Sequence, residues 1–126
     1  MVHVPEDLKY TEEHEWLKIE GNKVRYGITD FAQSELGDIV YIELPMVGDE
    51  FEKGEMIGVV ESVKTVSDLF SPVTGKVVKV NNALEDTPEI INENPYSDGW
   101  IAVIELAHED EMKELISAQE YEALVE

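Results

Sequence analysis

The chain has 126 residues, 43% of them hydrophobic, which suffices for one domain with a core but not for two independent domains. Its 29 acidic and 9 basic residues give a formal net charge of −20. This charge argues against binding to nucleic acid or to an anionic membrane surface, because both require a basic face. The acidity serves either solubility or steering toward partners with basic patches.

The sequence contains no cysteine, so the chain cannot form a disulfide, hold an iron–sulfur cluster or perform thiol chemistry with its own side chains. Any redox sulfur in its function must therefore be brought in. The opening segment MVHVPEDLKY has neither the apolar core of a signal peptide nor the Arg- and Ser-rich character of a transit peptide. No apolar run approaches membrane-spanning length, so we expect a soluble, cytoplasmic protein.

The first predicted elements are an arm and a hairpin. Residues 1–13 are polar and are expected to form an arm on the surface. Residues 16–20 and 23–28 predict two strands of a hairpin, joined through Gly21 and Asn22, a pair that tolerates positive φ.

A short helix and a strand are predicted next. In TDFAQSELGD, the spacing of Asp30 and Gln33 matches a capping box, and Gly37 marks the end of the helix. The following segment, DIVYIELP, is rich in β-branched and aromatic residues and predicts a strand that ends at Pro45.

The middle of the chain predicts several short strands separated by turns. A Gly-Asp turn, a short strand, Gly54 and a further strand lead to Lys64. The segments TVSDLF and KVVKVN predict strands on either side of the turn SPVTG. A polar loop, with at most one short helical turn, precedes a strongly apolar strand over residues 100–106.

The tail EDEMKELISAQEYEALVE predicts a helix, which Ser117 and Glu120 either restart or extend. The apolar residues expected near one face of it are Met112, Leu115, Ile116, Tyr121 and Leu124. The many short strands with peripheral helices predict a mainly β fold, a small barrel or sandwich, rather than an alternating α/β sheet.

Lys64 is expected at the apex of a tight chain reversal. Residues 59–67 contain no Gly, Pro, Asn or Asp, so the reversal must use negative φ throughout, as a type I turn does. Lys64 would then project into solvent, and the nearest basic residues in the sequence are Lys53 and Lys76. It is either an ordinary exposed lysine or a point of attachment.

The residues around Lys64 carry a family resemblance. The segment ESVKTVSDLFSPVTGKVVKVN resembles the lipoylation hairpin of the glycine cleavage system H proteins. The segments YTEEHEWLK, YGITDFAQSELGDIVYIELP, VGDEF and NPYSDGW, and the acidic C-terminal helix, resemble the same family in order and spacing. The likeness covers nearly the whole chain.

Two related classes of carrier fit less well. Biotin carriers flank the modified lysine with methionines, whereas here the neighbours are Val63 and Thr65. Lipoyl domains of 2-oxo acid dehydrogenases place an acid before the lysine and are shorter. This chain has Val63 there and adds an N-terminal hairpin–helix unit and a C-terminal helix.

The resemblance implies a flattened β-barrel/sandwich hybrid of the lipoyl/biotinyl-domain type, with a short helix after the N-terminal hairpin and a C-terminal helix. It implies one lipoyl-carrier domain over residues 1–126. Within it, a hairpin–helix extension would cover 1–37, the lipoyl hairpin core 38–106 and the C-terminal helix 107–126.

The implied function is that of a non-catalytic carrier. Lipoic acid would be joined to Lys64 as N6-lipoyllysine, flanked by Glu61, Ser62, Val63 and Thr65, and would change the net charge from −20 to about −21. The carrier would take the aminomethyl group of glycine from a pyridoxal-phosphate glycine decarboxylase (P protein) to a tetrahydrofolate aminomethyltransferase (T protein). Dihydrolipoyl dehydrogenase (L protein) would then reoxidise it, and a lipoate-attaching enzyme is the fourth partner.

In the family, the loaded arm moves from the tip to a groove near the HEW motif. Glu13, Glu15 and Asp68 would be candidate acceptors for its amine through charge-assisted hydrogen bonds, or else ordinary solvated acids. Glu61 and Asp68 are either surface acids or recognition elements for the lipoylating enzyme. His14 is expected to be a structural, hydrogen-bonding histidine, and no metal-ligand spacing is present.

An alternative function is a lipoate relay donor that serves 2-oxo acid dehydrogenase complexes. A variant that fails with the glycine decarboxylase but still supports lipoylation of those complexes would favour the relay. A stand-alone enzyme is disfavoured, since the sequence shows no nucleophile–base pair, metal cluster or phosphate loop.

Overall fold

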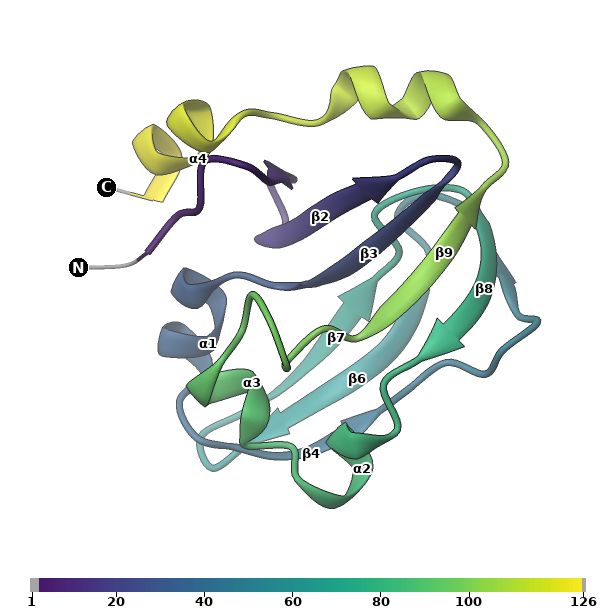
Figure 1. Cartoon of the computed structure of the whole chain (residues 1–126). Helices are drawn as coiled ribbons and strands as arrows, with labels where there is room; N and C mark the ends of the chain where they lie inside the picture. The colour runs from purple at the N-terminus through teal and green to yellow at the C-terminus, as the bar shows by residue number, and fades with distance from the viewer. Residues whose placement is uncertain (1–2, 126) are drawn as a thin grey trace.

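The computed structural model describes residues 3–125, which form nine strands in two antiparallel sheets with short helices around them (Figure 1). The predicted mainly β class is confirmed. The strands are β1 (Lys9–Tyr10), β2 (Glu15–Glu20), β3 (Lys23–Ile28), β4 (Ile39–Glu43), β5 (Glu50–Phe51), β6 (Met56–Ser62), β7 (Val66–Phe70), β8 (Gly75–Val80) and β9 (Ala102–Leu106).

One sheet has the order β1-β2-β3-β9-β8-β5 and the other β4-β6-β7. The predicted hairpin is confirmed as β2 and β3, with Gly21 at a φ of 66° in the turn. Because β3 also pairs with β9, this hairpin is part of the larger sheet. Within residues 3–125, no helix combines the length and the apolar character needed to cross a bilayer.

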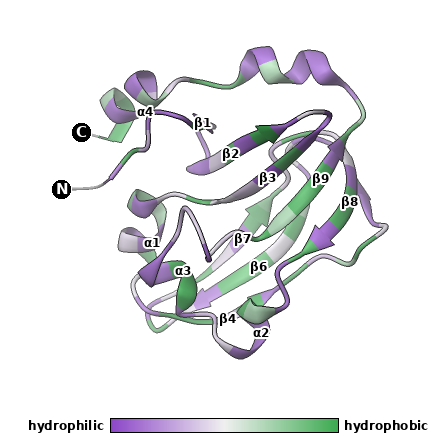
Figure 2. Cartoon of the chain, viewed as in Figure 1, coloured by the Kyte–Doolittle hydropathy of each residue, from purple (hydrophilic) through white to green (hydrophobic). Residues whose placement is uncertain are grey.

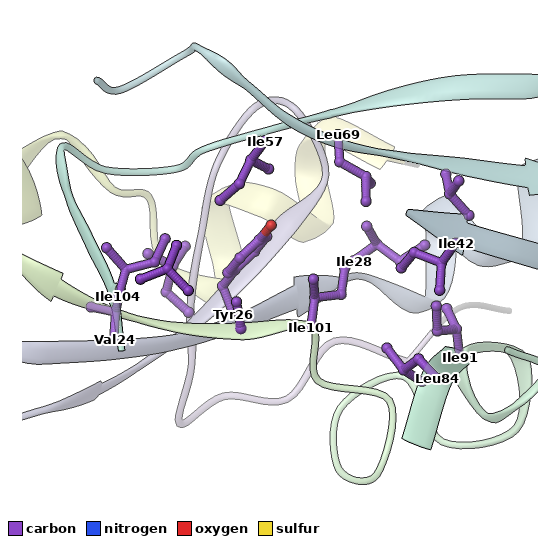
Figure 3. Packing of buried hydrophobic residues seen from close by; sticks show 14 of the residues in the cluster. Val24, Tyr26, Ile28, Ile42, Ile57, Leu69, Leu84, Ile91, Ile101 and Ile104 are labelled. Atoms are coloured by element: carbon purple, nitrogen blue, oxygen red, sulfur yellow. The ribbon is translucent and has the colours of Figure 1, made fainter. Parts of the chain in front are cut away.

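The main core lies between the two sheets (Figure 3). Tyr26 and Ile28 of β3 reach it from the larger sheet, and Ile57 and Leu69 reach it from β6 and β7. Figure 2 shows hydrophobic residues concentrated along the central strands, while the peripheral helices are more hydrophilic. Burial of this apolar surface is the main driving force that holds the sheets together.

A second, smaller core covers the opposite face of the β2–β3 hairpin. Trp16 lies there over Gly27, where a Cβ atom would come within 2.7 Å of the indole nitrogen. The expected surface arm is correct only in part: the charged side chains of residues 3–13 are exposed, but three apolar residues are buried, and residues 1 and 2 lie outside the described part of the chain. Val4, Leu8 and Tyr10 are buried in this cluster, where they pack together with Trp16.

The helix after β3 is α1 (Asp30–Leu36), and its end at Gly37 is confirmed, with a φ of 82°. The predicted capping box is wrong. Thr29, still in extended geometry, is the N-cap, and its Oγ1 accepts a hydrogen bond from the Ala32 backbone N–H at 3.2 Å. Asp30 instead accepts from the Gln33 side-chain amide at 2.7 Å.

The polar loop between β8 and β9 contains two helical turns where at most one was expected. They are α2 (Ala83–Asp86) and α3 (Ile90–Glu93), and each buries one apolar residue, Leu84 and Ile91 respectively. Both side chains belong to the main core, so packing of Leu84 and Ile91 against the core stabilises the two helical turns.

The predicted C-terminal helix is divided into a 3₁₀ helix, η1 (Glu109–Glu114), and α4 (Ala118–Val125). Between them Ile116 exchanges two backbone hydrogen bonds of 2.9 Å with Tyr10, which brings the two ends of the chain side by side (Figure 1). Ser117 and Glu120 then form a reciprocal capping pair that restarts the helix. Leu124 is 51% exposed and does not join the buried face.

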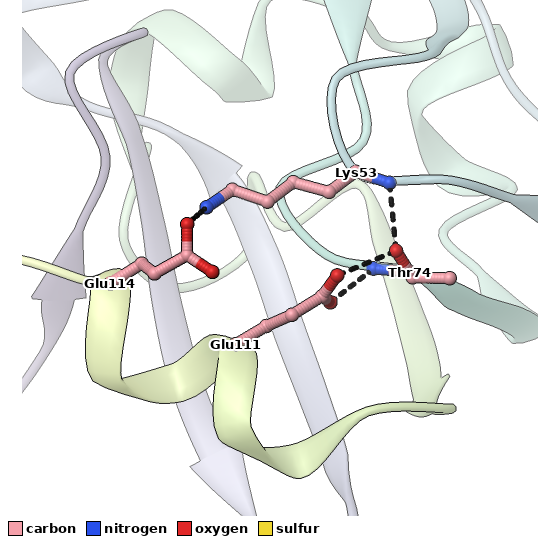
Figure 4. A network of polar contacts seen from close by, with 4 residues as sticks. All are labelled: Lys53, Thr74, Glu111 and Glu114. Atoms are coloured by element: carbon pink, nitrogen blue, oxygen red, sulfur yellow. Dashed lines mark hydrogen bonds and ion pairs between the residues drawn. The ribbon is translucent and has the colours of Figure 1, made fainter.

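Two glutamates of the 3₁₀ helix, Glu111 and Glu114, bind residues on the preceding part of the chain, including the turn before β8 (Figure 4). The Glu111 carboxylate accepts hydrogen bonds from the Thr74 backbone N–H and hydroxyl, both at 2.7 Å. Glu114 lies 2.6 Å from the Lys53 ammonium, and the Lys53 backbone N–H donates to the Thr74 hydroxyl at 3.0 Å. This network holds the C-terminal segment against the larger sheet.

Candidate functional site: an exposed lysine and an acidic cleft

Lys64 lies at the tip of the β6–β7 hairpin. The Ser62 N–H donates to the Thr65 carbonyl at 2.8 Å and closes the turn. The Ser62 hydroxyl oxygen accepts from the backbone N–H groups of Lys64 and Thr65, each at 3.2 Å. Among residues 3–125 the only non-glycine residue with positive φ is His14, so the predicted all-negative turn is confirmed.

The tip is also held from the side by the end of α1. The Val63 N–H donates to the Asp38 carbonyl at 3.0 Å. The Lys64 side chain lies over Gly37, where a Cβ atom would stand 3.0 Å from its Cε. The lysine backbone is therefore fixed from two directions.

The Lys64 side chain is nevertheless exposed. In the described part of the chain, the ion pairs are Arg25–Glu20 and Lys53–Glu114, so the Lys64 ammonium takes part in neither. Of its flanking residues, Glu61, Val63 and Thr65 are exposed, while Ser62 is buried as the brace of the turn. The amine is accessible to a modifying enzyme.

A cleft of about 360 Å³ lies beside this hairpin, between the start of β2, the helix α1 and the edge strand β7. Glu13, Glu15 and Asp68 all belong to its lining, although Asp68 is distant from the other two in the sequence. Phe31 and Leu36 of α1 contribute apolar wall. The structure thus brings the three acids to one concave surface.

Glu15 differs from the other two acids because it is only 4% exposed. Burial raises the pKa of its carboxyl to about 8, and the negative charge of Glu13 adds to the increase. The hydrogen bond from the Thr11 hydroxyl, at 2.9 Å, works in the opposite direction. Glu13 and Asp68 are exposed. A cation in this cleft would favour the ionised form of Glu15 and be held by it.

His14 lies between Glu13 and Glu15 and also lines the cleft. Its φ is 67°, its Nδ1 is 2.8 Å from the Tyr121 hydroxyl, and its ring packs on Phe31 with centroids 4.8 Å apart. Burial lowers the pKa of His14, although Glu13 and Glu35 oppose the shift. The predicted hydrogen-bonding role of this histidine is confirmed.

Several residues of the site could not be found from sequence reasoning. The apolar wall of α1 and the contact of Tyr121 with His14 depend on segments that meet only in the folded chain. Glu15 did carry a signal, because β-strand alternation places it on the same face as Leu17, which is in the main core. An acid at such a position predicts burial and a raised pKa.

The chain is similar to known proteins over nearly its whole length. A family model described as "Glycine cleavage H-protein" matches residues 8–126. The glycine cleavage system H protein of Halalkalibacterium halodurans is 59% identical over 125 residues, covering 99% of this chain and 98% of the relative. That of Carboxydothermus hydrogenoformans is 56% identical over 123 residues, with 98% and 95% coverage.

Among solved structures, the crystal structure of a glycine cleavage system H protein from Mycobacterium marinum superposes with a TM-score of 0.86. Its sequence identity is 41%, and the match covers 95% of this chain and 97% of that one. The family match extends over nearly the whole chain and includes both the hairpin and the cleft. The chain belongs to the glycine cleavage H-protein family, the lipoyl carriers of glycine cleavage.

Proposed function

We propose that Lys64 carries lipoic acid as an amide and that the chain delivers the aminomethyl group of glycine from the P protein to the T protein before reoxidation by the L protein. When attached, lipoic acid supplies the redox disulfide that a chain without cysteine lacks. The observation that carries the proposal is an exposed lysine, outside any ion pair of the described residues, at the tip of a braced turn.

The residues at the tip serve recognition by enzymes. Ser62 and the Asp38 carbonyl hold the turn in one conformation, so a lipoate-attaching enzyme meets the lysine in a constant geometry. Glu61, Val63 and Thr65 are the exposed neighbours that this enzyme would contact. Attachment to a stiff hairpin also keeps the carried group at high effective concentration near each partner enzyme.

The residues of the cleft serve retention of the carried amine. Glu13, Glu15 and Asp68 would accept hydrogen bonds from it as an ammonium. The buried Glu15 would lose its proton as the cation docks, because an adjacent positive charge lowers a carboxyl pKa. The wall formed by Phe31 and Leu36 would limit the access of water.

The proposal is tested by intact mass and peptide mapping after expression in a host supplied with lipoate. We expect one lipoyl group, on Lys64. Lys64→Arg should remain unmodified and inactive when glycine cleavage is reconstituted with the P, T and L proteins. The matched control is Lys76→Arg, which alters another exposed lysine, in β8, and should be lipoylated and active. A lipoyl group on a different lysine, or activity of Lys64→Arg, would refute the proposal.

A further inference from the structure

A chain of three polar side chains connects the cleft to the C-terminal helix. The Tyr121 hydroxyl of α4 lies 2.8 Å from His14 Nδ1 and 2.7 Å from the Thr29 hydroxyl. Thr29 and Tyr121 are both fully buried. These groups therefore form hydrogen bonds with one another rather than with water.

The proton of Thr29 sets the direction. The Thr29 hydroxyl oxygen already accepts from the Ala32 N–H, and within residues 3–125 Tyr121 is the only group placed to take its proton. A buried hydroxyl proton without an acceptor is costly. Thr29 therefore donates to Tyr121, and Tyr121 donates its single proton to His14 Nδ1.

This hydrogen-bond arrangement selects one tautomer of the His14 imidazole. Burial lowers the pKa of His14 and raises the pKa of Tyr121, so the ring is neutral and the phenol keeps its proton near neutral pH. With Nδ1 accepting, the ring proton resides on Nε2. The lone pair of the neutral ring lies on Nδ1, where it accepts the hydrogen bond from the Tyr121 hydroxyl. The opposite tautomer would leave a free lone pair on Nε2, which has no partner among residues 3–125.

A free imidazole lone pair would matter because His14 lines the cleft between two of its acids. Imidazole is an effective base near neutral pH. Loss of a carried amine begins when a base removes one proton from the ammonium. The nitrogen lone pair then forms a C=N bond as the C–S bond breaks, sulfur leaves as a thiolate, and water converts the iminium to formaldehyde and ammonium.

We propose that Tyr121 is a positioning residue that holds His14 in the Nε2–H tautomer and so keeps the basic imidazole lone pair away from the amine in the cleft. The inference rests on the proposed function for its consequence, but not for the hydrogen-bond arrangement itself. By this proposal the C-terminal helix α4 has a role in carrier chemistry through Tyr121, which is 107 residues from His14 in the sequence.

The arrangement is tested by ¹⁵N NMR of the histidine rings in the full-length protein, with His14 assigned by comparison with His14→Asn. Asparagine suits this position because it tolerates positive φ. We expect a pyrrole-type Nε2 and a pyridine-type Nδ1. Tyr121→Phe should raise the population of the Nδ1–H tautomer about five- to tenfold, the ratio that one lost hydrogen bond produces.

Tyr10→Phe is the matched control. It removes a hydroxyl from the ring stacked on Tyr121, with centroids 4.8 Å apart, and that hydroxyl bonds to the Pro5 carbonyl and not to His14. It should leave the His14 ring signals unchanged. A protonated Nδ1 in the wild type, or no change in Tyr121→Phe, would overturn the inference.

The consequence is tested by the rate at which the loaded, lipoylated protein loses its amine in the absence of the T protein. Tyr121→Phe should lose it several-fold faster than the wild type, but should cause no further acceleration in a His14→Asn background. Equal acceleration in both backgrounds would show a merely structural effect and refute the role. If the wild type is not lipoylated or loaded at all, the proposed function fails, while the NMR result still decides the tautomer.

Discussion

Glu15 occupies an environment that favours its neutral form. Its side chain faces the interior from the first position of β2, and among residues 3–125 only the Thr11 hydroxyl donates a hydrogen bond to its carboxyl group. The fully buried Tyr26 hydroxyl, which has no hydrogen-bond partner in residues 3–125, is close enough for the Glu15 charge to raise the pKa of that phenol further. An ionised Glu15 is therefore costly until a cation is brought to it.

We predict that Glu15 makes stability depend on pH. Its pKa is raised from 4.5 to about 8 on folding, so the folded chain holds a proton that the unfolded chain releases. The resulting destabilisation is absent below about pH 4.5, grows up to about pH 8 and is constant above, with a total on the order of a few kcal/mol. Urea unfolding of Glu15→Gln should lack this contribution.

Glu12→Gln is the control for that experiment, because it removes an exposed carboxyl of the same segment that does not contribute to the raised pKa of Glu15. The difference in unfolding free energy between Glu15→Gln and the wild type should increase with pH across this window. A difference that is independent of pH would show that Glu15 ionises normally.

At the scale of elements, the end of α1 and the tip of the β6–β7 hairpin form one unit. Gly37 ends the helix and leaves room for the Lys64 side chain, and the next residue, Asp38, binds the Val63 N–H. The conformation of Gly37, with φ 82° and ψ −161°, belongs to a region that is essentially restricted to glycine.

We expect Gly37→Ala to lower the free energy of unfolding by about 1–3 kcal/mol, because alanine is strained in that backbone region. It should also speed hydrogen exchange at the Val63 amide, since the Asp38 carbonyl would shift. Gly21→Ala is the matched control. Gly21 also has positive φ, but a Cβ there meets nothing within 4 Å in the described residues, so Val63 exchange should stay unchanged. Unaltered Val63 exchange in Gly37→Ala would contradict this coupling.

The whole molecule combines two cores with a strongly acidic surface. The segment before β2 and the helix α4 form the second core together, and Tyr121 of α4 contacts His14 of the cleft. The formal net charge of −20 imposes self-repulsion on this compact state. The same charge would favour encounter with partner enzymes that present basic surfaces.

We predict that the melting temperature rises with salt. Between 0.01 and 0.15 M salt the Debye length falls from about 30 to about 8 Å, which screens much of the repulsion. The expected increase is several degrees, the shift that about 1 kcal/mol produces at this size. Changing the exposed residues Glu12, Glu85 and Glu109 to Gln reduces the charge from −20 to −17 and should weaken the response.

The matched control keeps the charge by changing the same three residues to Asp. It should respond to salt as the wild type does. A melting temperature that is independent of salt, or equal responses of the Gln and Asp variants, would show that self-repulsion is not a significant contribution.

Local patterns were sufficient for several features of this protein. The turn pair Gly21 and Asn22 between two strand-like segments predicted the β2–β3 hairpin, and Gly37 predicted the end of α1. The lack of turn-forming residues in 59–67 predicted a negative-φ turn that exposes Lys64. These features depend on backbone preferences and on neighbours within a few positions, which the sequence displays directly.

The remaining features depend on contacts between distant segments, so they were decided by the tertiary structure. Val4, Leu8 and Tyr10 of the N-terminal segment are buried because they pack with Trp16 in the second core, and the tail is divided where Ile116 pairs with Tyr10. Asp68 joins the acids of the HEW segment only when β7 packs beside α1. The sequence by itself determined which residues could bear charge and where strands and turns would form. Packing decided which of those charges are buried and brought together, because desolvation and proximity are properties of the folded chain.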